Sequence, residues 1–475
     1  MSKTARIIIV FCIVAAIASP AQTFKILVSF NDTDGEYPTS PLVQGLDGDF
    51  YGTTSGGGTH FDGTVFKVTP AGMLTTLYNF CSQASCADGG GPADLVLATD
   101  GNFYGTTGGG GTKFAGTVFK ITPGGTLTTL YTFCSQADCA DGNGPHAGLV
   151  QDPDGNFYGT TQLGGASSFG TVFKITPAGK LTTLHRFEAT DGIAPYAGLV
   201  MGSDGKLYGT TYAGGDQRCW NEGCGTVFAI TMSGTLTTLH RFDQTDGAHP
   251  LAGLVQASDG HFYGTTANGG TYNICRHGCG TIFKITAAGA LTTLHNFKQN
   301  DGGHPAGGLR QATDGNFYGS AAQGGNKYGT IYKFVYTSGR RTLTTLHKFD
   351  GTDGASPGGS LLQATNGSFY GVAAHGGGGD CSAYGCGTAF RLSVGLQPFV
   401  RTLPTSSKVG RAVSILGNEL AGATGVTFNG TAAMFKVVSN TEIKTTVPSA
   451  ATTGFVTVTT PKGTLKSNVV FRILP

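Results

Sequence analysis

The chain has 475 residues, of which 79 are Gly and 18 are Pro, and only 12% of them are charged. Gly has no period of three, which excludes collagen, and 39% hydrophobic residues with 30 Phe and 17 Tyr exclude wholesale disorder. Few charges, many aromatic residues and abundant Gly are typical of short strands joined by many turns, so we expect an all-β fold.

The first 21 residues have the pattern of an export signal. Lys3 and Arg6 precede the apolar stretch 7–18, and small residues permit cleavage after Ala21. The apolar stretch is too short to span a bilayer, so we predict no membrane span after cleavage; a retained N-terminal anchor is the alternative. The expected location is secreted or cell envelope, either extracellular or periplasmic.

Cleavage also removes the net charge. Lys3 and Arg6 account for the formal charge of +2, so the mature chain is neutral and gives no electrostatic reason to expect nucleic acid as a partner. Residues 398–475 nevertheless carry eight Lys or Arg and only two Glu, and the rest of the mature chain carries the balancing negative charge. These opposite charges suggest that the two parts dock on each other.

An internal repeat dominates residues 22–397. The phrase aromatic-or-Leu, Tyr, Gly recurs seven times, with its tyrosines at Tyr51, Tyr104, Tyr158, Tyr208, Tyr263, Tyr318 and Tyr370. The phrase GT[VIA][FY] follows each time, and LTTLxxF follows in six of the seven units. Each unit is predicted to have four strands, as in 148–151, 157–161, 171–176 and 181–187 of the third. Such a unit cannot bury both of its faces alone, so neighbouring units must stack.

The missing seventh LTTLxxF indicates how the array closes. The last unit has no fourth strand after Arg391, whereas the mature N-terminus has a spare strand, 24–30, followed by the usual Asp34-Gly35 turn. A ring would let this strand complete the last unit, and an open array would leave both edges unpaired. We therefore predict a seven-bladed β-propeller for 22–397, with an open solenoid as the alternative.

The repeat resembles the GloVer tandem-repeat family of exported bacterial proteins. The resemblance rests on DGNFYGTT, GTVFKIT and LTTL, as in residues 154–184, and extends over nearly all of 24–391. It implies an exported repeat protein, often with a surface anchor, and no defined reaction.

Residues 398–475 break the repeat and form a predicted second domain. Short strands are expected at 413–417, 425–430 and 454–458. With its GxxV, VxFNG and VP phrases, this segment resembles an IPT/TIG domain, an immunoglobulin-like β-sandwich. That resemblance implies a spacer or an interaction module and no catalysis.

Ten cysteines remain after cleavage, in five close pairs. An exported chain with an even cysteine count favours disulfides. Zinc is the alternative, but no pair has a second CxxC or a His pair nearby. The predicted disulfides are Cys81/Cys86, Cys134/Cys139, Cys219/Cys224, Cys275/Cys279 and Cys381/Cys386.

Antiparallel strand order places all five pairs in loops at one face of the disc. Because stapled loops on a rigid scaffold favour binding, this disulfide face is the candidate functional surface, although protection of long loops is the alternative. Trp220 is the only Trp and lies inside a stapled loop, where it either contacts a ligand or covers its own disulfide. The candidate ligand-binding residues are Trp220, Arg218, Glu222, Arg276, His277, His249 and His304.

Repeated polar residues of this face are expected to be structural. An Asp-Gly turn recurs in every unit, and Asp191, Asp246 and Asp301 are the candidate Ca²⁺ ligands, but Asp before Gly commonly accepts backbone hydrogen bonds. His follows LTTL in four units and Tyr in two, which favours packing or a surface hydrogen bond over metal ligation. No catalytic residue and no cofactor other than this Ca²⁺ is predicted.

The leading functional prediction is a noncatalytic exported binding or scaffold protein that presents the disulfide face to an extracellular glycan or protein. The first alternative is a propeller hydrolase or polysaccharide lyase, which needs nonrepeated acids, bases or metal ligands near the ring axis. The second is a purely structural envelope component.

Overall fold

The structure is a computed structural model that describes residues 22–215, 219, 222–272, 274–337, 340–378, 381 and 384–475. The export signal predicted for residues 1–21 lies outside this range. Nearly all elements are strands, and the helical segments of the described residues are two short 3-10 turns, η1 (Ala84–Cys86) and η2 (Ala137–Cys139). The predicted all-β class is confirmed. Within the described residues, no helix has both the length and the apolar character that crossing a bilayer requires.

Four-stranded antiparallel sheets follow one another along the repeat, and consecutive strands pair within each sheet. The first three sheets are formed by β2 (Val43–Gln44), β3 (Phe50–Thr54), β4 (Thr64–Val68) and β5 (Leu74–Asn79); by β6 (Gly90–Leu97), β7 (Phe103–Gly109), β8 (Thr117–Ile121) and β9 (Leu127–Thr132); and by β10 (Val150–Gln151), β11 (Phe157–Thr161), β12 (Thr171–Ile175) and β13 (Leu181–Arg186). The next three are formed by β14 (Val200–Met201), β15 (Leu207–Thr211), β16 (Thr226–Ile230) and β17 (Leu236–Arg241); by β18 (Val255–Gln256), β19 (Phe262–Thr266), β20 (Thr281–Ile285) and β21 (Leu291–Asn296); and by β22 (Arg310–Gln311), β23 (Phe317–Ala321), β24 (Thr330–Thr337) and β25 (Arg340–Lys348).

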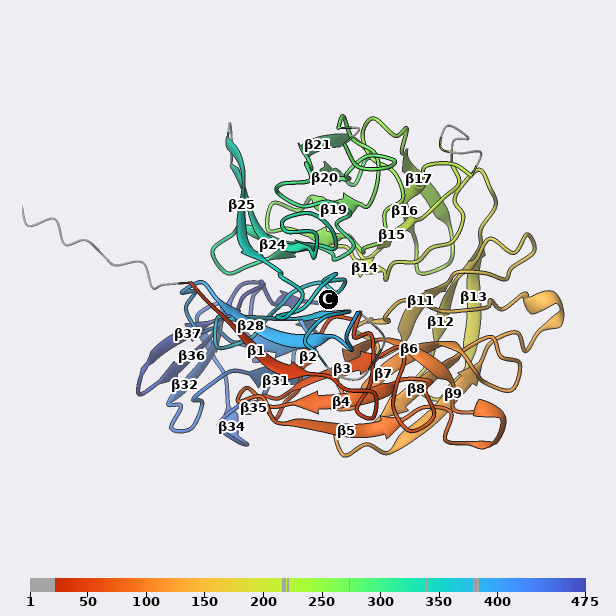
Figure 1. Ribbon diagram of the computed structural model, residues 1–475. Coiled ribbons are helices and arrows are strands. Elements are labelled where there is room, and N and C mark those ends of the chain that lie inside the picture. Colours follow the sequence, from red (N-terminus) through yellow and green to blue (C-terminus); the bar gives the residue numbers. More distant parts are fainter. Residues whose placement is uncertain are drawn as a thin grey trace, which may run out of the picture.

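The last sheet of the repeat joins the two ends of the array. It contains β26 (Leu362–Gln363), β27 (Phe369–Ala373), β28 (Thr388–Ser393) and, as its fourth strand, β1 (Thr23–Ser29) from the N-terminus. The two strands run antiparallel, with Phe24 opposite Leu392, and Figure 1 shows β1 in red alongside β28 in light blue. The predicted completion of the last unit by the N-terminal strand is confirmed.

Aromatic stacking joins each sheet to the next. The Tyr of one FYG phrase packs on the Phe of the following phrase, with ring centroids 3.9 to 4.3 Å apart. The series closes on itself, because Tyr370 of the last sheet stacks on Phe50 of the first. Leu207 replaces Phe in the fourth unit and shares a core cluster with Tyr158. The aromatic residues thus cover the faces that one unit alone leaves open.

Glutamine side chains add a polar clamp between neighbouring sheets. In five units the Gln at the end of the first strand accepts a hydrogen bond from a backbone N–H in the turn of the preceding unit. Gln44 reaches back in this way to the buried Thr365 N–H at 3.0 Å, across the junction between the last and first units. The ring closure therefore has the same contacts as the other junctions.

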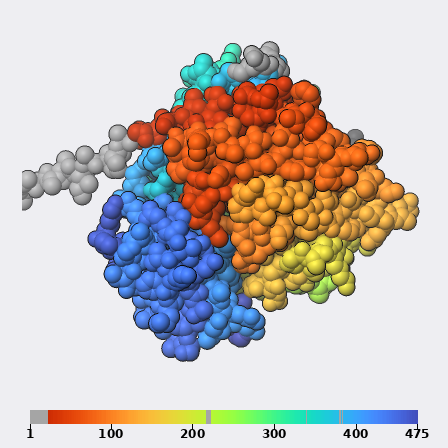
Figure 2. All heavy atoms as spheres, turned by 90° about the horizontal axis from the view of Figure 1, so that it is seen from below, coloured from red at the N-terminus to blue at the C-terminus, as the bar shows by residue number. Residues whose placement is uncertain are grey.

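Residues 398–475 form a separate pair of sheets. One contains β29 (Arg401–Leu403), β31 (Ala412–Leu416), β35 (Glu442–Thr446) and β34 (Phe435–Val437); the other contains β33 (Thr431–Ala432), β32 (Gly425–Phe428), β36 (Val456–Thr460) and β37 (Gly463–Lys466); β30 (Ser406–Ser407) pairs in parallel with β38 (Arg472–Ile473). The predicted strands at 413–417, 425–430 and 454–458 correspond to β31, β32 and β36. Figure 2 shows these residues as a blue lobe packed against the red and orange units.

Removing Phe30 tests the energetic importance of the ring closure. Phe30 directly follows β1, is 1% exposed, and packs edge-on against Phe66 of the first sheet with ring centroids 4.9 Å apart. We expect Phe30→Ala to lower the free energy of unfolding by about 3–5 kcal/mol, measured by urea denaturation. Phe61→Ala is the matched control, because Phe61 is 70% exposed. Equal urea midpoints for the two variants would contradict this role of the closing strand.

Candidate functional site

Five disulfides staple the loops at one end of the sheets. All predicted pairs are bonded: Cys81–Cys86, Cys134–Cys139, Cys219–Cys224, Cys275–Cys279 and Cys381–Cys386. Some lie after the fourth strand of a unit and others between the second and third strands. Isolated bridges such as Ile193 to Ala213 join these two kinds of loop, so both lie at the same end. The disulfide face predicted from strand order therefore exists.

The repeated Asp residues of this face hold the turns together. His185 Nε2 lies 2.9 Å from Asp191 Oδ2, and Asp191 Oδ1 accepts the Glu188 N–H at 2.8 Å. Asp246 and Asp301 make the same pair with the His of their own units, at 2.7 and 3.2 Å. Where Tyr replaces His, its hydroxyl donates to the equivalent Asp. The predicted hydrogen bond of the LTTLH histidine is thus observed, and its partner is the Asp of the Asp-Gly turn.

Ca²⁺ binding by Asp191, Asp246 and Asp301 stays a prediction. The three carboxylates belong to different units, and none of them is in a group of three candidate metal ligands among the described residues. Two such groups exist there, one with Glu36 and one with Asp62, but both depend on cysteines that are bonded in disulfides.

The predicted ligand-binding cluster is only partly described. Trp220 and Arg218 lie outside the described residues, whereas Glu222, Arg276 and His277 are exposed and His249 is buried. Burial lowers the pKa of His304, and the charge of His277 lowers it further. His277 also acts on His249, whose pKa is lowered mainly by burial. The structure therefore brings His249, His277 and His304 into one electrostatic neighbourhood.

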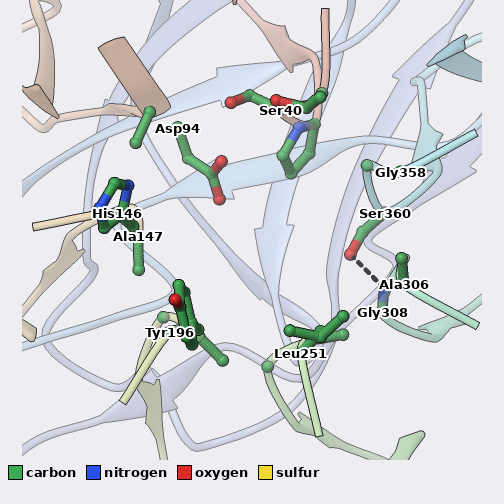
Figure 3. Close-up of a pocket in the computed structure, with 18 of the residues that line it drawn as sticks. Ser40, Asp94, His146, Ala147, Tyr196, Leu251, Ala306, Gly308, Gly358 and Ser360 are labelled. Atoms are coloured by element: carbon green, nitrogen blue, oxygen red, sulfur yellow. Dashed lines mark hydrogen bonds between the residues drawn. The ribbon is translucent and has the colours of Figure 1, made fainter. Parts of the chain in front are cut away.

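A cavity at the ring axis lies beside this cluster, and sequence reasoning missed it. It measures about 240 Å³ and is lined by all seven repeat units, mainly through residues at or just before the first strand of each sheet. Figure 3 shows Asp94, His146 and Tyr196 on one side of the cavity, with Ser360 and Gly308 on another. The backbone N–H of Gly308 donates to Ser360 Oγ at 2.9 Å.

Asp94 breaks the symmetry of the innermost ring of this cavity. Ala93 O, Ala147 O and Ala197 O each accept a hydrogen bond from a Thr hydroxyl of the preceding unit. The three alanines therefore occupy equivalent positions, and so do the residues that directly follow them. The equivalent residues are Pro41, Asp94, Gly148, Gly198, Gly253, Gly308 and Ser360, and all of them except Gly148 line the cavity. A Cβ on Gly148 would lie 2.7 Å from Asp94 Cβ, so the glycine next to Asp94 provides the space for it. The cavity thus has one carboxylate where most units have no side chain.

The environment of Asp94 raises the pKa of its carboxyl group toward neutral pH. Burial raises the pKa of Asp94 to about 6, although a hydrogen bond from Ser40 and one from the Gly148 N–H act in the opposite direction. The side chain still lines the open cavity, so a ligand there can reach it. A carboxylic acid with this pKa changes its charge just below physiological pH.

His146 and Tyr196 supply rings to the cavity. Each directly follows the Pro that recurs at the equivalent position of every unit. A Cβ on Gly108 would lie 2.7 Å from His146 Cε1, so Gly108 makes room for the imidazole. Burial lowers the pKa of His146, which favours the neutral ring at pH 7. Tyr196 accepts a hydrogen bond from Gln162 Nε2, which fixes its hydroxyl.

Aromatic contacts connect the axial cavity to the predicted cluster. The rings of His146 and Tyr196 have centroids 6.0 Å apart, and Tyr196 packs edge-on against Tyr212 at 5.4 Å. Tyr212 stacks on His249 at 4.4 Å. A continuous aromatic track therefore leads from the cavity to His249, one of the candidates identified in sequence.

A register comparison of the seven units would have identified these residues. After the Pro, the successive units have Thr39, none in the shortened second unit, His146, Tyr196, Leu251, Ala306 and Gly358. A position this variable between constant neighbours is unusual for a packing role. The search for repeated phrases passed over it because it belongs to no phrase.

Replacing Asp191 and removing Ca²⁺ together distinguish two roles of this carboxylate, hydrogen bonding within its turn and Ca²⁺ binding. We expect Asp191→Ala to reduce the free energy of unfolding by about 1–3 kcal/mol, because the Glu188 N–H and His185 lose their acceptor. Asp154→Ala, in an exposed turn, is the control. If the Asp191 role is only the turn, EDTA leaves the urea midpoint of the wild type unchanged; a midpoint that falls with EDTA and returns with CaCl₂ would favour the Ca²⁺ site instead.

Solved structures similar to this one share its fold at low sequence identity. The extracellular domain of a protein assigned as a one component system of B. thetaiotaomicron matches 96% of this chain at 11% identity with a TM-score of 0.50. A second structure of an extracellular domain from that organism, assigned to a hybrid two component system, matches 96% at 12% identity with a TM-score of 0.50. The present chain spans 58% and 60% of those chains. A Thermus thermophilus protein assigned as an oxidoreductase (glucose dehydrogenase) matches 78% of this chain and 100% of its own at 13% identity, with a TM-score of 0.40.

The sequence itself matches one repeat family along most of its length. No curated protein matches it significantly. The family described as the Gloeobacter/Verrucomicrobia repeat matches residues 13–221, 134–276 and 218–433, as three overlapping tandem copies. The tandem-repeat resemblance seen in DGNFYGTT and LTTL is thereby confirmed, while the IPT/TIG-like resemblance stays a prediction. Because the three matches together span residues 13–433, the chain belongs to the Gloeobacter/Verrucomicrobia repeat family.

Proposed function

We propose that this protein is an exported glycan-binding protein whose axial cavity takes one sugar ring. The five disulfides and the extracellular character of the similar domains support export. The observation that carries the proposal is the broken symmetry of the cavity: one Asp, one His and one Tyr project where the other units have small or apolar residues. A repeat that served only as a scaffold would not need this difference.

The chemistry of the cavity matches a sugar better than an apolar ligand. Its volume of about 240 Å³ is below the range of roughly 300–1,000 Å³ that is typical for drug-sized ligands. Asp94, Ser40 and Ser360 offer oxygen atoms for hydroxyl groups, and Tyr196 and His146 offer ring faces for the apolar side of a pyranose. The aromatic track extends the site toward Glu222, Arg276 and His277 in the stapled loops and toward His304 in the neighbouring loop. A longer glycan would follow this track, and Trp220 and Arg218 belong to the same proposed surface.

The domain assignment belongs to the same proposal. The seven sheets act as the blades of a seven-bladed β-propeller over 22–397, and 398–475 act as an IPT/TIG-like spacer or docking module. The ring of Tyr–Phe contacts supports the first assignment, and the two packed sheets support the second.

A hydrolase is the second candidate function, because Asp94 and His146 are nonrepeated titratable groups at the axis. Glycoside hydrolysis commonly uses a pair of carboxylates. Asp94 is the one carboxylate among the described residues that line the cavity. Binding without cleavage therefore fits the cavity better.

Glycan-array binding by the mature chain tests the proposal. Any oligosaccharide that binds on the array is then measured by isothermal titration. Its affinity should be about tenfold or more lower for Tyr196→Ala, because loss of a ring face removes its stacking contact. Phe61→Ala is the matched control, since this exposed aromatic residue lies on the same face outside the cavity. Absence of binding to the whole array, or an equal effect of both variants, would overturn the proposed site. Release of a shorter sugar by wild type but not Asp94→Asn would favour the hydrolase.

Sugar affinity should depend on pH through Asp94. Above its pKa of about 6 the carboxylate accepts charge-assisted hydrogen bonds from sugar hydroxyls, and below that pH it is protonated and a weaker acceptor. Affinity should therefore rise between pH 5 and pH 7 (a window of about one unit on either side of the pKa). Asp94→Asn should bind more weakly at pH 7 and show no such rise. A rise that persists in Asp94→Asn would assign it to another group, such as His146.

A further inference from the structure

The C-terminal residues contact the end of the ring opposite the cavity. Asn418 Nδ2 donates to Thr365 Oγ1 at 2.8 Å, and Thr441 Oγ1 donates to Leu46 O at 2.8 Å. Arg472 Nη1 donates to Ser203 O at 2.9 Å. Thr365 and Leu46 belong to the last and first units, and Ser203 belongs to the fourth, across the ring. The C-terminal residues therefore contact the first, fourth and last units. No ion pair among the described residues joins the two parts, so the predicted charge attraction is not expressed as salt bridges.

Arg310 is an exception on the innermost strands. The equivalent residues of the other units are Val43, Val96, Val150, Val200, Val255 and Leu362. Arg310 follows the cavity residue Gly308 by two positions, which places it about 7 Å farther along the strand at the usual rise. Its Nε donates to Leu361 O at 3.4 Å, a weak contact with the neighbouring unit.

Arg401 approaches the same place from the C-terminal residues. It lies in β29, and the nearby Phe399 N–H donates to Thr365 O at 3.0 Å, which fixes this segment against the last unit. Burial and, to a smaller extent, the charge of Arg310 together lower the pKa of Arg401 to about 10. Both arginines thus belong to segments that contact residues 361–365 of the last unit, and the charge of Arg310 acts on Arg401 there.

Neither of these two charges has a carboxylate partner among the described residues. Among the described residues, no carboxylate forms an ion pair with either arginine, and none hydrogen-bonds to the Arg401 guanidinium. Burial of like charges without a counter-ion is strongly unfavourable. Both residues remain partly accessible to solvent, so small ions can reach them.

We propose that Arg310 and Arg401 together bind a phosphate- or sulfate-type oxyanion between the axial cavity and the C-terminal residues. Guanidinium groups present paired N–H donors that match two oxygens of such an anion, and two of them from different directions neutralise a doubly charged group. The anion would also join the C-terminal residues to the repeat. Its source is either the free ion or a charged substituent of a glycan held in the axial cavity.

Titration of the mature chain with inorganic phosphate tests this site, with sodium chloride at matched ionic strength as the reference. We expect a saturable rise of the melting temperature for the wild type and a phosphate Kd raised about tenfold or more in Arg401→Gln and Arg310→Val. Arg310→Val introduces the residue found in five other units, so it should fold. Without phosphate, both variants should melt at or above the wild-type temperature, because a buried unpaired charge is gone. Arg411→Gln, at an exposed position, is the control.

Two comparisons separate the outcomes. A phosphate response unaffected by Tyr196→Ala identifies a free-ion site, whereas glucose 6-phosphate binding that needs both Tyr196 and Arg310 identifies a substituent of the cavity ligand. Either result supports the arginine site, and the first does so even if the cavity binds no glycan. An equal phosphate response in wild type, Arg411→Gln, Arg310→Val and Arg401→Gln would overturn it, as would no response in the wild type.

Discussion

Each four-stranded sheet of residues 22–397 has two apolar faces, and its own unit can cover neither of them. Stacking of Tyr on Phe from one unit to the next supplies the cover, and it continues from Tyr370 back to Phe50. The pairing of β1 with β28 removes the two open edges that a linear array would have. Because closure makes every unit dependent on both neighbours, the inner strands are brought to a common axis at fixed register. The cavity exists only as a consequence of that closure.

A rigid, nearly symmetric frame allows function to reside in a few exceptions. Glycine at most positions of the innermost ring keeps the axis free of side chains, and Asp94 then has space to project into it. Gly108 leaves room for the imidazole of His146. Gln162 holds the hydroxyl of Tyr196 through a hydrogen bond. The repeated Asp–His pairs, by contrast, have identical partners in several units and maintain the turns. Departure from the repeat is therefore the better guide to binding chemistry.

The two ends of the axis differ in character. The disulfide face carries the cavity with its carboxylate and aromatic rings, whereas the C-terminal residues contact the opposite end, and Arg310 and Arg401 belong to segments against residues 361–365 of the last unit. One chain thus places an acidic group and two basic groups at different depths along the same axis. Neither set is apparent from the composition, because the 30 basic and 28 acidic residues of the chain nearly balance.

The repeat phrases, the spare N-terminal strand and the five cysteine pairs by themselves determined the all-β class, the unit boundaries, the closing strand and the disulfides. These features are local or periodic, so hydrophobic pattern and turn residues suffice to predict them. Asp94, His146 and Tyr196 belong to different units, far apart along the chain, and they converge only because inner strands from all units meet at the axis. The approach of Arg401 to Arg310 depends on how the C-terminal residues dock, which no repeat or spacing encodes. Tertiary structure decided the site because convergence at an axis is a property of the closed ring, and no single unit contains it.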